Sequence, residues 1–193
     1  MGILDHLKKY DTEPDAKRRV RELYKKDGVE ATYSEGSNLL GPQAGFDGDV
    51  YNTKEYPPEI LAHELGHVKK PENIIGRANR RIAPASNVLG MSASVSAPIV
   101  AAMDHNPSVG KTLGTAVLPA IASTPAIAEE VRANYHANKK LKEIYKDDPE
   151  KLKRSRRNLG KAFSTYLAAP VLGGAATIGV GLMKNRMKGE DDG

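Results

Sequence analysis

Hydrophobic and polar positions divide the second half of the chain into long uncharged and long charged stretches. Three segments contain no Asp, Glu, Lys or Arg, namely residues 82–103, 112–128 and 162–183. Each is long enough for a helix that crosses the hydrocarbon core of a bilayer. We therefore predict an apolar helical hairpin over residues 82–128, inserted in a membrane, and a third apolar helix from residue 162. The alternative for the hairpin is a buried, Ala-rich pair of helices in a soluble domain.

The first part of the chain follows shorter patterns. Residues 1–27 have apolar positions at helical spacing and predict two short helices, the second of which begins at Pro14. Residues 29–56 show a weak alternation of apolar and polar positions, interrupted by turn residues. This pattern predicts short strands, one of them at 49–52. That strand precedes a helix that begins at Pro57, and it suits an edge strand that pairs with a substrate backbone. The predicted fold class is therefore α+β, mainly α.

These changes of pattern define four segments. The first, residues 1–81, holds the N-terminal helices, the short strands and the helix after Pro57. The second is the apolar hairpin, 82–128, and the third, 129–161, is a charged segment. The fourth, 162–193, joins an apolar, Gly-rich helix to a charged tail that we expect to be disordered. Glycine this dense destabilises a helix in water but is common in membrane helices.

Composition limits the partners and the metal ligands. Aromatic residues make up 5% of the chain and Trp is absent, which argues against a nucleic-acid reader that stacks bases on aromatic rings. Positive charge gathers beside the apolar stretches, which suits the anionic cytoplasmic leaflet of a membrane. Because Cys is absent, any zinc ligands must be His and carboxylate side chains. The N-terminus becomes charged at once, so no secretory signal is expected.

One predicted helix carries the sequence His63-Glu64-Leu65-Gly66-His67, which fits the pattern HExxH. On a helix, the two histidines project from the same face, at a spacing that lets both imidazoles reach one zinc ion. Glu64 can then act as the general base for a zinc-activated water that attacks a peptide carbonyl. The alternative is a pair of histidines on an ordinary surface helix.

A catalytic zinc site needs a third protein ligand and a position left for water. The pattern HExxHxxGxxH is excluded, because Lys70 and Asn73 occupy its Gly and His positions. A Glu from a later helix is the other common arrangement, and Glu129 and Glu130 directly follow the apolar hairpin. Since a hairpin returns the chain to the side of the membrane from which it started, either carboxylate can meet the histidine pair in one compartment.

These motifs resemble those of the HtpX-like integral-membrane zinc peptidases, which are gluzincins. That family pairs HExxH with a downstream E-x-x-A-D, and the matching sequence here is E-V-R-A-N, beginning at Glu130. The resemblance covers about residues 57–136 and implies a small zincin-like catalytic core with Glu130 as the third zinc ligand. Two features depart from the family. Its transmembrane helices before HExxH have no counterpart here, and Asn134 replaces the Asp that would orient a ligand histidine.

The leading interpretation is a membrane-associated, zinc-dependent metalloendopeptidase with its active site on the cytoplasmic side. His63, His67 and Glu130 are the expected metal ligands, and Glu64 is the expected general base. The expected partners are a protein or peptide substrate and membrane lipid, and no nucleic acid. One alternative is a non-enzymatic, membrane-active or structural assembly protein, for example of a phage type, with a vestigial HExxH. The other is a soluble, cytoplasmic zincin.

The sequence leaves two further choices open. A third full span at residues 162–183 places Lys184 and Lys188 in the compartment opposite the metal site, against the charge rule, so this helix is alternatively re-entrant, buried or peripheral. No donor for the oxyanion of the reaction is evident, although His105, Tyr135 and His136 are candidates.

Overall fold

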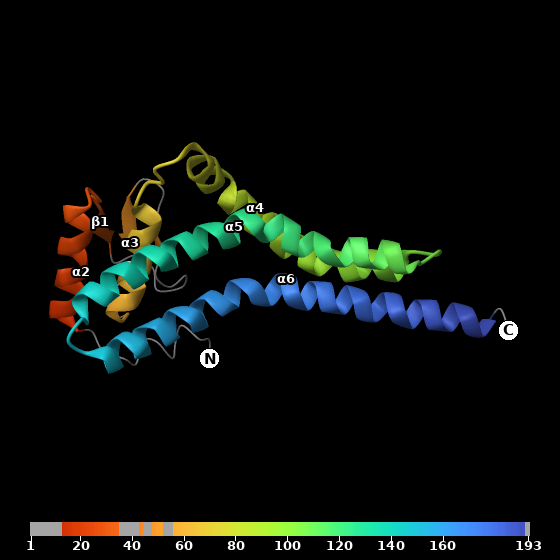
Figure 1. The fold of residues 1–193 in the computed structure, drawn as a ribbon. Coiled ribbons are helices and arrows are strands. Elements are labelled where there is room, and N and C mark those ends of the chain that lie inside the picture. Colours follow the sequence, from red (N-terminus) through yellow and green to blue (C-terminus); the bar gives the residue numbers. More distant parts are fainter. Residues whose placement is uncertain (1–12, 35–42, 45–47, 52–55, 192–193) are drawn as a thin grey trace. The chain divides into compact units, whose positions relative to one another are not determined.

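The computed structural model of the protein describes most of the chain. The described residues are 13–34, 43–44, 48–51 and 56–191, and the helix predicted nearest the N-terminus lies outside them. This part is mainly helical with one small three-stranded sheet, which confirms the predicted class of α+β, mainly α (Figure 1). The chain forms two compact units: unit 1 is residues 1–72 and 129–163, and unit 2 is residues 73–128 and 164–193.

Unit 1 contains the short elements of the fold. They are α2 (Pro14–Lys26), β1 (Thr32–Ser34), β2 (Gln43–Ala44), β3 (Asp49–Tyr51) and α3 (Pro58–Val68). The strand predicted just before the HExxH helix is confirmed as β3. The prediction that it is an edge strand was wrong, because β1 pairs with one side of β3 in parallel and β2 pairs with the other side in antiparallel fashion.

Local signals set the ends of α2 and α3. Each helix begins at a proline, whose missing N–H is not needed in the first turn. α2 ends at Lys26 and is capped by Asp27, and the following Gly28 adopts a φ of 75°, a conformation that favours glycine. α3 ends at Val68, three residues before Pro71.

Three long helices carry the uncharged stretches. They are α4 (Ile74–Met103), α5 (Val109–Ile144) and α6 (Pro149–Asp191). The stretch predicted as a hairpin lies in two helices, α4 and α5, joined by a turn at residues 104–108. α5 and α6 run without a break through the segment boundaries predicted after residues 128 and 161, so each long helix contributes to both units.

The charged tail after residue 183 is helical as far as Asp191, so the prediction of disorder there was wrong. Its lysines have partners within unit 2. The Lys184 ammonium donates to the carbonyls of Ala102 and Asp104, and Lys188 donates to the side-chain oxygen of Asn106. These contacts hold the end of α6 against the turn between α4 and α5.

Large apolar side chains fill the core of unit 1, as in a water-soluble domain. The core includes Val20, Leu23, Tyr24, Val50, Leu61, Leu65, Leu141, Ile144 and Leu159. The buried hydroxyl of Tyr24 also donates a 2.7 Å hydrogen bond to the carbonyl of Ala62. That bond ties α2 to the middle of α3, the helix that carries the histidine pair.

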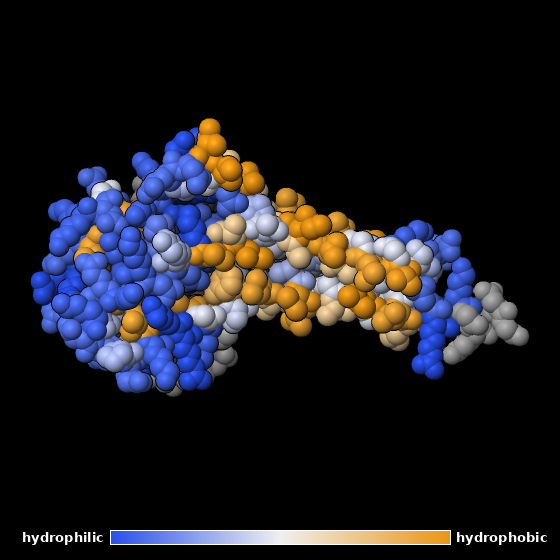
Figure 2. Space-filling model, in the orientation of Figure 1, coloured by the Kyte–Doolittle hydropathy of each residue, from blue (hydrophilic) through white to orange (hydrophobic). Residues whose placement is uncertain are grey.

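Unit 2 has the opposite polarity. Among its described residues, the buried ones are all Ala, Ser, Thr, Gly or Pro apart from Arg80. Large apolar side chains point outward from all three helices, for example Val95 (68% exposed), Leu118 (51%) and Leu172 (68%). Figure 2 shows these apolar surfaces along the helices and polar side chains at the α4–α5 turn. Within the described chain, α4 and α6 are each long and apolar enough to cross a membrane.

Candidate metal centre

The first two candidate ligands project from the same side of α3. His63 and His67 are four residues apart, just over one helical turn, and their ring centroids are 4.7 Å apart. The start of the same helix is fixed by Glu59, a buried residue whose carboxylate accepts hydrogen bonds from Ser155 and Asn158 of α6. The histidines therefore stand on a helix that is anchored within the core of unit 1.

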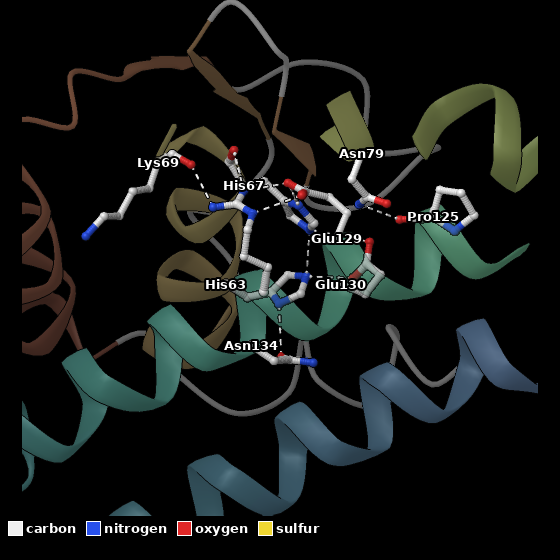
Figure 3. Close-up of polar contacts among 9 residues, drawn as sticks. His63, His67, Lys69, Asn79, Pro125, Glu129, Glu130 and Asn134 are labelled. Carbon is white, nitrogen blue, oxygen red and sulfur yellow. Dashed lines mark hydrogen bonds and ion pairs between the residues drawn. The ribbon is translucent and has the colours of Figure 1, made fainter. Parts of the chain in front are cut away.

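α5 brings a carboxylate to the same point. Oε2 of Glu130 lies 3.1 Å from Nε2 of His63, and its Oε1 lies 3.4 Å from Nε2 of His67. The two Nε2 atoms are themselves 3.0 Å apart (Figure 3). One possible ligand atom from each of these residues lies within 4.8 Å of the other two, so the group could hold a metal ion. The three residues predicted as ligands from the sequence are thus neighbours in the fold.

The outer nitrogen of each histidine faces a hydrogen-bond acceptor on α5. Nδ1 of His63 lies 3.0 Å from the side-chain oxygen of Asn134, and Nδ1 of His67 lies 3.5 Å from Oε1 of Glu129 (Figure 3). A proton held on Nδ1 by such an acceptor leaves the lone pair of Nε2 free for a metal. Asn134 makes this contact with His63 through a neutral amide oxygen.

Glu130 supports a cation at the point where the ligand atoms meet. Its Oε2 atom is buried and receives no hydrogen bond, although Nε2 of His63 is near it. Such an atom is costly to bury, and a metal ion would satisfy it. Burial alone would raise the pKa of Glu130, but the two adjacent imidazoles outweigh burial and lower it to about 2. The carboxyl is therefore ionised, as a metal ligand must be.

His67 also shows that the site attracts positive charge. Burial alone would lower the pKa of this imidazole, but the carboxylates of Glu129 and Glu130 outweigh burial and raise it to about 10. Protons and metal ions compete for the same nitrogen lone pair. A bound cation can replace the proton that these two carboxylates otherwise stabilise.

Arg132 is a functional neighbour that the sequence did not reveal. Its guanidinium pairs with both carboxylate oxygens of Glu129 and also donates to the carbonyls of His67 and Lys69 at the end of α3. Burial would raise the pKa of Glu129, but this ion pair and His67 lower it to about 2. Arg132 thus holds Glu129 as an anion behind His67 and satisfies the last carbonyls of the helix. The only sequence signal was its i,i+3 spacing from Glu129.

Close packing of α3 on α5 brings these groups together. Gly66 lies against Ala133, and a Cβ added to this glycine would be 2.7 Å from the carbonyl oxygen of Ala133 and 3.0 Å from its Cα. Both residues are buried. The absence of a side chain at Gly66 therefore allows the helix backbones to approach closely enough for Glu130 to reach the histidines.

Replacing Gly66 with Ala is expected to destabilise the fold and weaken metal binding, because the obstacle is backbone that cannot move aside. Overpacking of this kind typically costs about 1–3 kcal/mol. The control is Gly160→Ala in α6, where the exposed position has open space for a Cβ and helix propensity favours Ala by about 1 kcal/mol. Thermal unfolding and zinc titration of both variants measure the effect. Wild-type zinc affinity in Gly66→Ala would contradict the role given to this contact.

Glu64 is buried and interacts electrostatically with the ligand group. Burial raises the pKa of its carboxyl, His63 and His67 oppose that shift, and Glu130 adds to it. Glu64 is not among the residues whose atoms converge as possible ligands. Glu64 lies between the two histidines in the sequence of α3.

The three residues predicted as candidate oxyanion donors are His105, Tyr135 and His136. His105 lies in the turn of unit 2. Tyr135 is 65% exposed, and its ring packs edge-on against that of His136, with centroids 5.4 Å apart. Within the described part of the chain, neither Tyr135 nor His136 has a hydrogen bond or ion pair to the ligand group. Burial first, and then the charges of Lys69 and Arg132, lower the pKa of His136 to about 4.

Comparison of the chain with protein-family models, with curated proteins and with solved structures gives no match. The resemblance to HtpX-like peptidases therefore stays a prediction that depends on HELGH and E-V-R-A-N. Both motifs are short, and the geometry of the site is the stronger support for a function.

Proposed function

We propose that the protein is a zinc-dependent metalloendopeptidase with a zincin-like core of the HtpX-like gluzincin type. The observation that carries this proposal is the convergence of His63, His67 and Glu130 at one buried point, beside a further buried carboxyl on Glu64. An accidental HExxH on a surface helix has no reason to meet an ionised carboxylate from a segment more than sixty residues later.

The donor set favours zinc among the common metals. Two imidazole nitrogens and one carboxylate form the ligand set of many catalytic zinc sites, with a fourth position open to water. Calcium and magnesium prefer sites built from oxygen ligands alone. Asn134 and Glu129 behind the two histidines provide the outer hydrogen bonds that orient zinc-bound imidazoles.

A small number of residues would carry out the proposed chemistry. Zinc, when bound, supplies a Lewis acid that activates water and polarises the scissile carbonyl. Asn134 and Glu129 hold the Nδ1 protons of His63 and His67, which keeps both Nε2 lone pairs directed at the metal position. Glu64 accepts the proton of the attacking water and then delivers it to the leaving amine.

We also propose that this enzyme acts at a membrane, with its active site on the cytoplasmic side and a protein or peptide as substrate. The length and apolar character of α4 and α6 support membrane association, as do the large apolar side chains exposed on unit 2. A soluble zincin would bury those side chains in its core. The basic segments that flank the uncharged stretches favour the cytoplasmic side for the site.

Removing the metal is expected to abolish peptide hydrolysis, and one equivalent of Zn²⁺ is expected to restore it. The full chain is purified in detergent, its zinc content is measured, and cleavage of unfolded protein and of a peptide library is followed before and after chelation. The control pair is His67→Ala, which should lose the metal, and His105→Ala, which should keep it because His105 lies in the unit 2 turn. A wild-type protein that binds no stoichiometric zinc would favour the non-enzymatic alternative.

A further inference from the structure

We propose that α4, the first part of α5 and the distal part of α6 cross a lipid bilayer together as a three-helix transmembrane unit. The α4–α5 turn and the end of α6 then lie in the compartment opposite the metal centre. This inference rests on the membrane association proposed above and is independent of peptidase activity. In this arrangement both α5 and α6 cross the whole membrane. By mean hydropathy alone, α4 and α6 qualify as spans and α5 does not. The positive charges after residue 183 had argued against a full span by α6.

Within unit 2, α6 packs against both α4 and α5. A Cβ on Gly173 would be 2.6 Å from Cα of Ser94 in α4, and a Cβ on the next residue, Gly174, would be 2.8 Å from the carbonyl oxygen of Ala116 in α5. Adjacent glycines thus contact two different helices. Close backbone approach at small residues is the usual way in which helices pack in lipid, where no hydrophobic force drives them together.

Polar groups inside unit 2 are satisfied by the unit itself. Pro125 interrupts the hydrogen-bond ladder of α5, and the hydroxyl of Ser86 from α4 inserts at this point. It donates to the carbonyl of Ala122 at 2.6 Å and accepts from the N–H of Ala126 at 3.2 Å. Thr177 similarly donates to a carbonyl of its own helix. Lipid offers no hydrogen-bond partners, so spanning helices require such internal satisfaction.

The outer surface of unit 2 fits acyl chains in both chemistry and length. The outward residues are large and apolar on all three helices, whereas the interior holds small residues. At 1.5 Å per residue, the uncharged stretches measure roughly 25–33 Å. The hydrocarbon core of a bilayer is about 30 Å thick. In water, these apolar faces would be buried against one another. Because they point outward instead, we infer that lipid covers them.

Two lysines near the end of α6 form hydrogen bonds with the end of α4 and with the α4–α5 turn. The ammonium of Lys184 lies 2.6 Å from the carbonyl oxygens of both Ala102, in the last turn of α4, and Asp104, which follows that helix. Lys188 lies 2.9 Å from Oδ1 of Asn106. A cation suits the negative end of a helix. α6 therefore runs the full length of the unit, as a span does and a re-entrant segment does not.

The distribution of Lys and Arg indicates which side of the membrane faces the cytoplasm. Residues 62–81 and 129–161 flank the spans on the side of the metal centre and contain sixteen Lys or Arg, whereas residues 104–111 and 184–193 contain four. The positive-inside rule therefore still places the metal centre in the cytoplasm when α6 spans the membrane. Lys184 and Lys188, which argued against a third span, are outnumbered, and both have partners at or beside the α4–α5 turn.

Single-cysteine labelling tests this topology directly, because the natural chain contains no Cys. Four full-length variants are made: His105→Cys in the turn, Met187→Cys near the end of α6, Glu143→Cys on unit 1 and Leu172→Cys in the middle of the α6 span. A membrane-impermeant maleimide is added to spheroplasts of a bacterial host, to lysed membranes and to SDS-denatured protein. We expect the turn and the end of α6 to react in spheroplasts, and Glu143→Cys to react only after lysis.

Leu172→Cys separates lipid from water as the covering of unit 2. This side chain is 68% exposed in the protein alone, so a hydrated unit would react at once. We expect reaction only after denaturation. Labelling of Leu172→Cys in membranes, or labelling of Met187→Cys and Glu143→Cys from the same side, would overturn the proposal. Zinc content is measured on the same preparations, so a failed metal centre and a failed topology are distinguished.

Discussion

Replacing Glu64 with Gln is expected to lower the rate of peptide hydrolysis by about 10²–10⁴-fold, the usual contribution of a general base. Gln has nearly the same shape as Glu but cannot accept the proton of the attacking water. Because Glu64 is outside the group of converging ligand atoms, zinc binding is expected to remain stoichiometric. The measurements are the turnover number on a peptide substrate and the zinc content of the same sample.

The matched control is Glu143→Gln, an exposed glutamate on α5 that belongs to unit 1. It removes the same charge from the same unit and is expected to leave the rate unchanged. A Glu64→Gln variant with wild-type turnover would remove Glu64 from the mechanism. Loss of zinc from that variant would instead mean that Glu64 takes part in binding the metal.

Replacing Glu130 with Gln is expected to weaken zinc binding by more than about 100-fold, beyond the 10–100-fold range typical of partners that only orient a ligand. Its carboxylate lies within 3.1–3.4 Å of both Nε2 atoms, and one of its oxygens is buried without a hydrogen bond. An amide offers zinc a neutral and weaker oxygen ligand. Competition with a chromophoric chelator measures the affinity.

Glu129→Gln is the neighbouring control, and about a tenfold loss of zinc affinity is expected. Glu129 faces the outer nitrogen of His67 and pairs with Arg132, and an amide oxygen can still accept the proton of that nitrogen. The order of the two effects decides the assignment. A larger loss in Glu129→Gln than in Glu130→Gln would make Glu129 the ligand.

Adjacent glutamates explain why the sequence left this choice open. Residues i and i+1 of a helix point about 100° apart, so only one of Glu129 and Glu130 can reach the Nε2 atoms of both histidines, although both carboxylates contact His67. Which one does so depends on how α5 is rotated against α3, and the contact of Gly66 with Ala133 sets that rotation. Arg132 was missed for the same reason, since its partners include carbonyls on α3 that no local pattern indicates.

The edge-strand prediction failed for a similar cause. The sequence predicts a short strand at residues 49–52, but the number of strands that pair with it depends on other parts of the chain. β1 and β2 both pair with β3, which places it in the middle of the sheet. The helical tail after residue 183 was also beyond local prediction, because Lys184 and Lys188 find their partners about eighty residues earlier.

The sequence by itself determined the features that depend on local spacing. These are the histidine pair on one face of a helix, the helix starts at prolines, and three uncharged stretches of membrane length. Tertiary structure alone decided which carboxylate meets the histidines, what holds their outer nitrogens, and that unit 2 turns its large side chains outward. The physical reason is that spacing along a helix fixes only the direction of a side chain, whereas its partner is set by how separate helices pack.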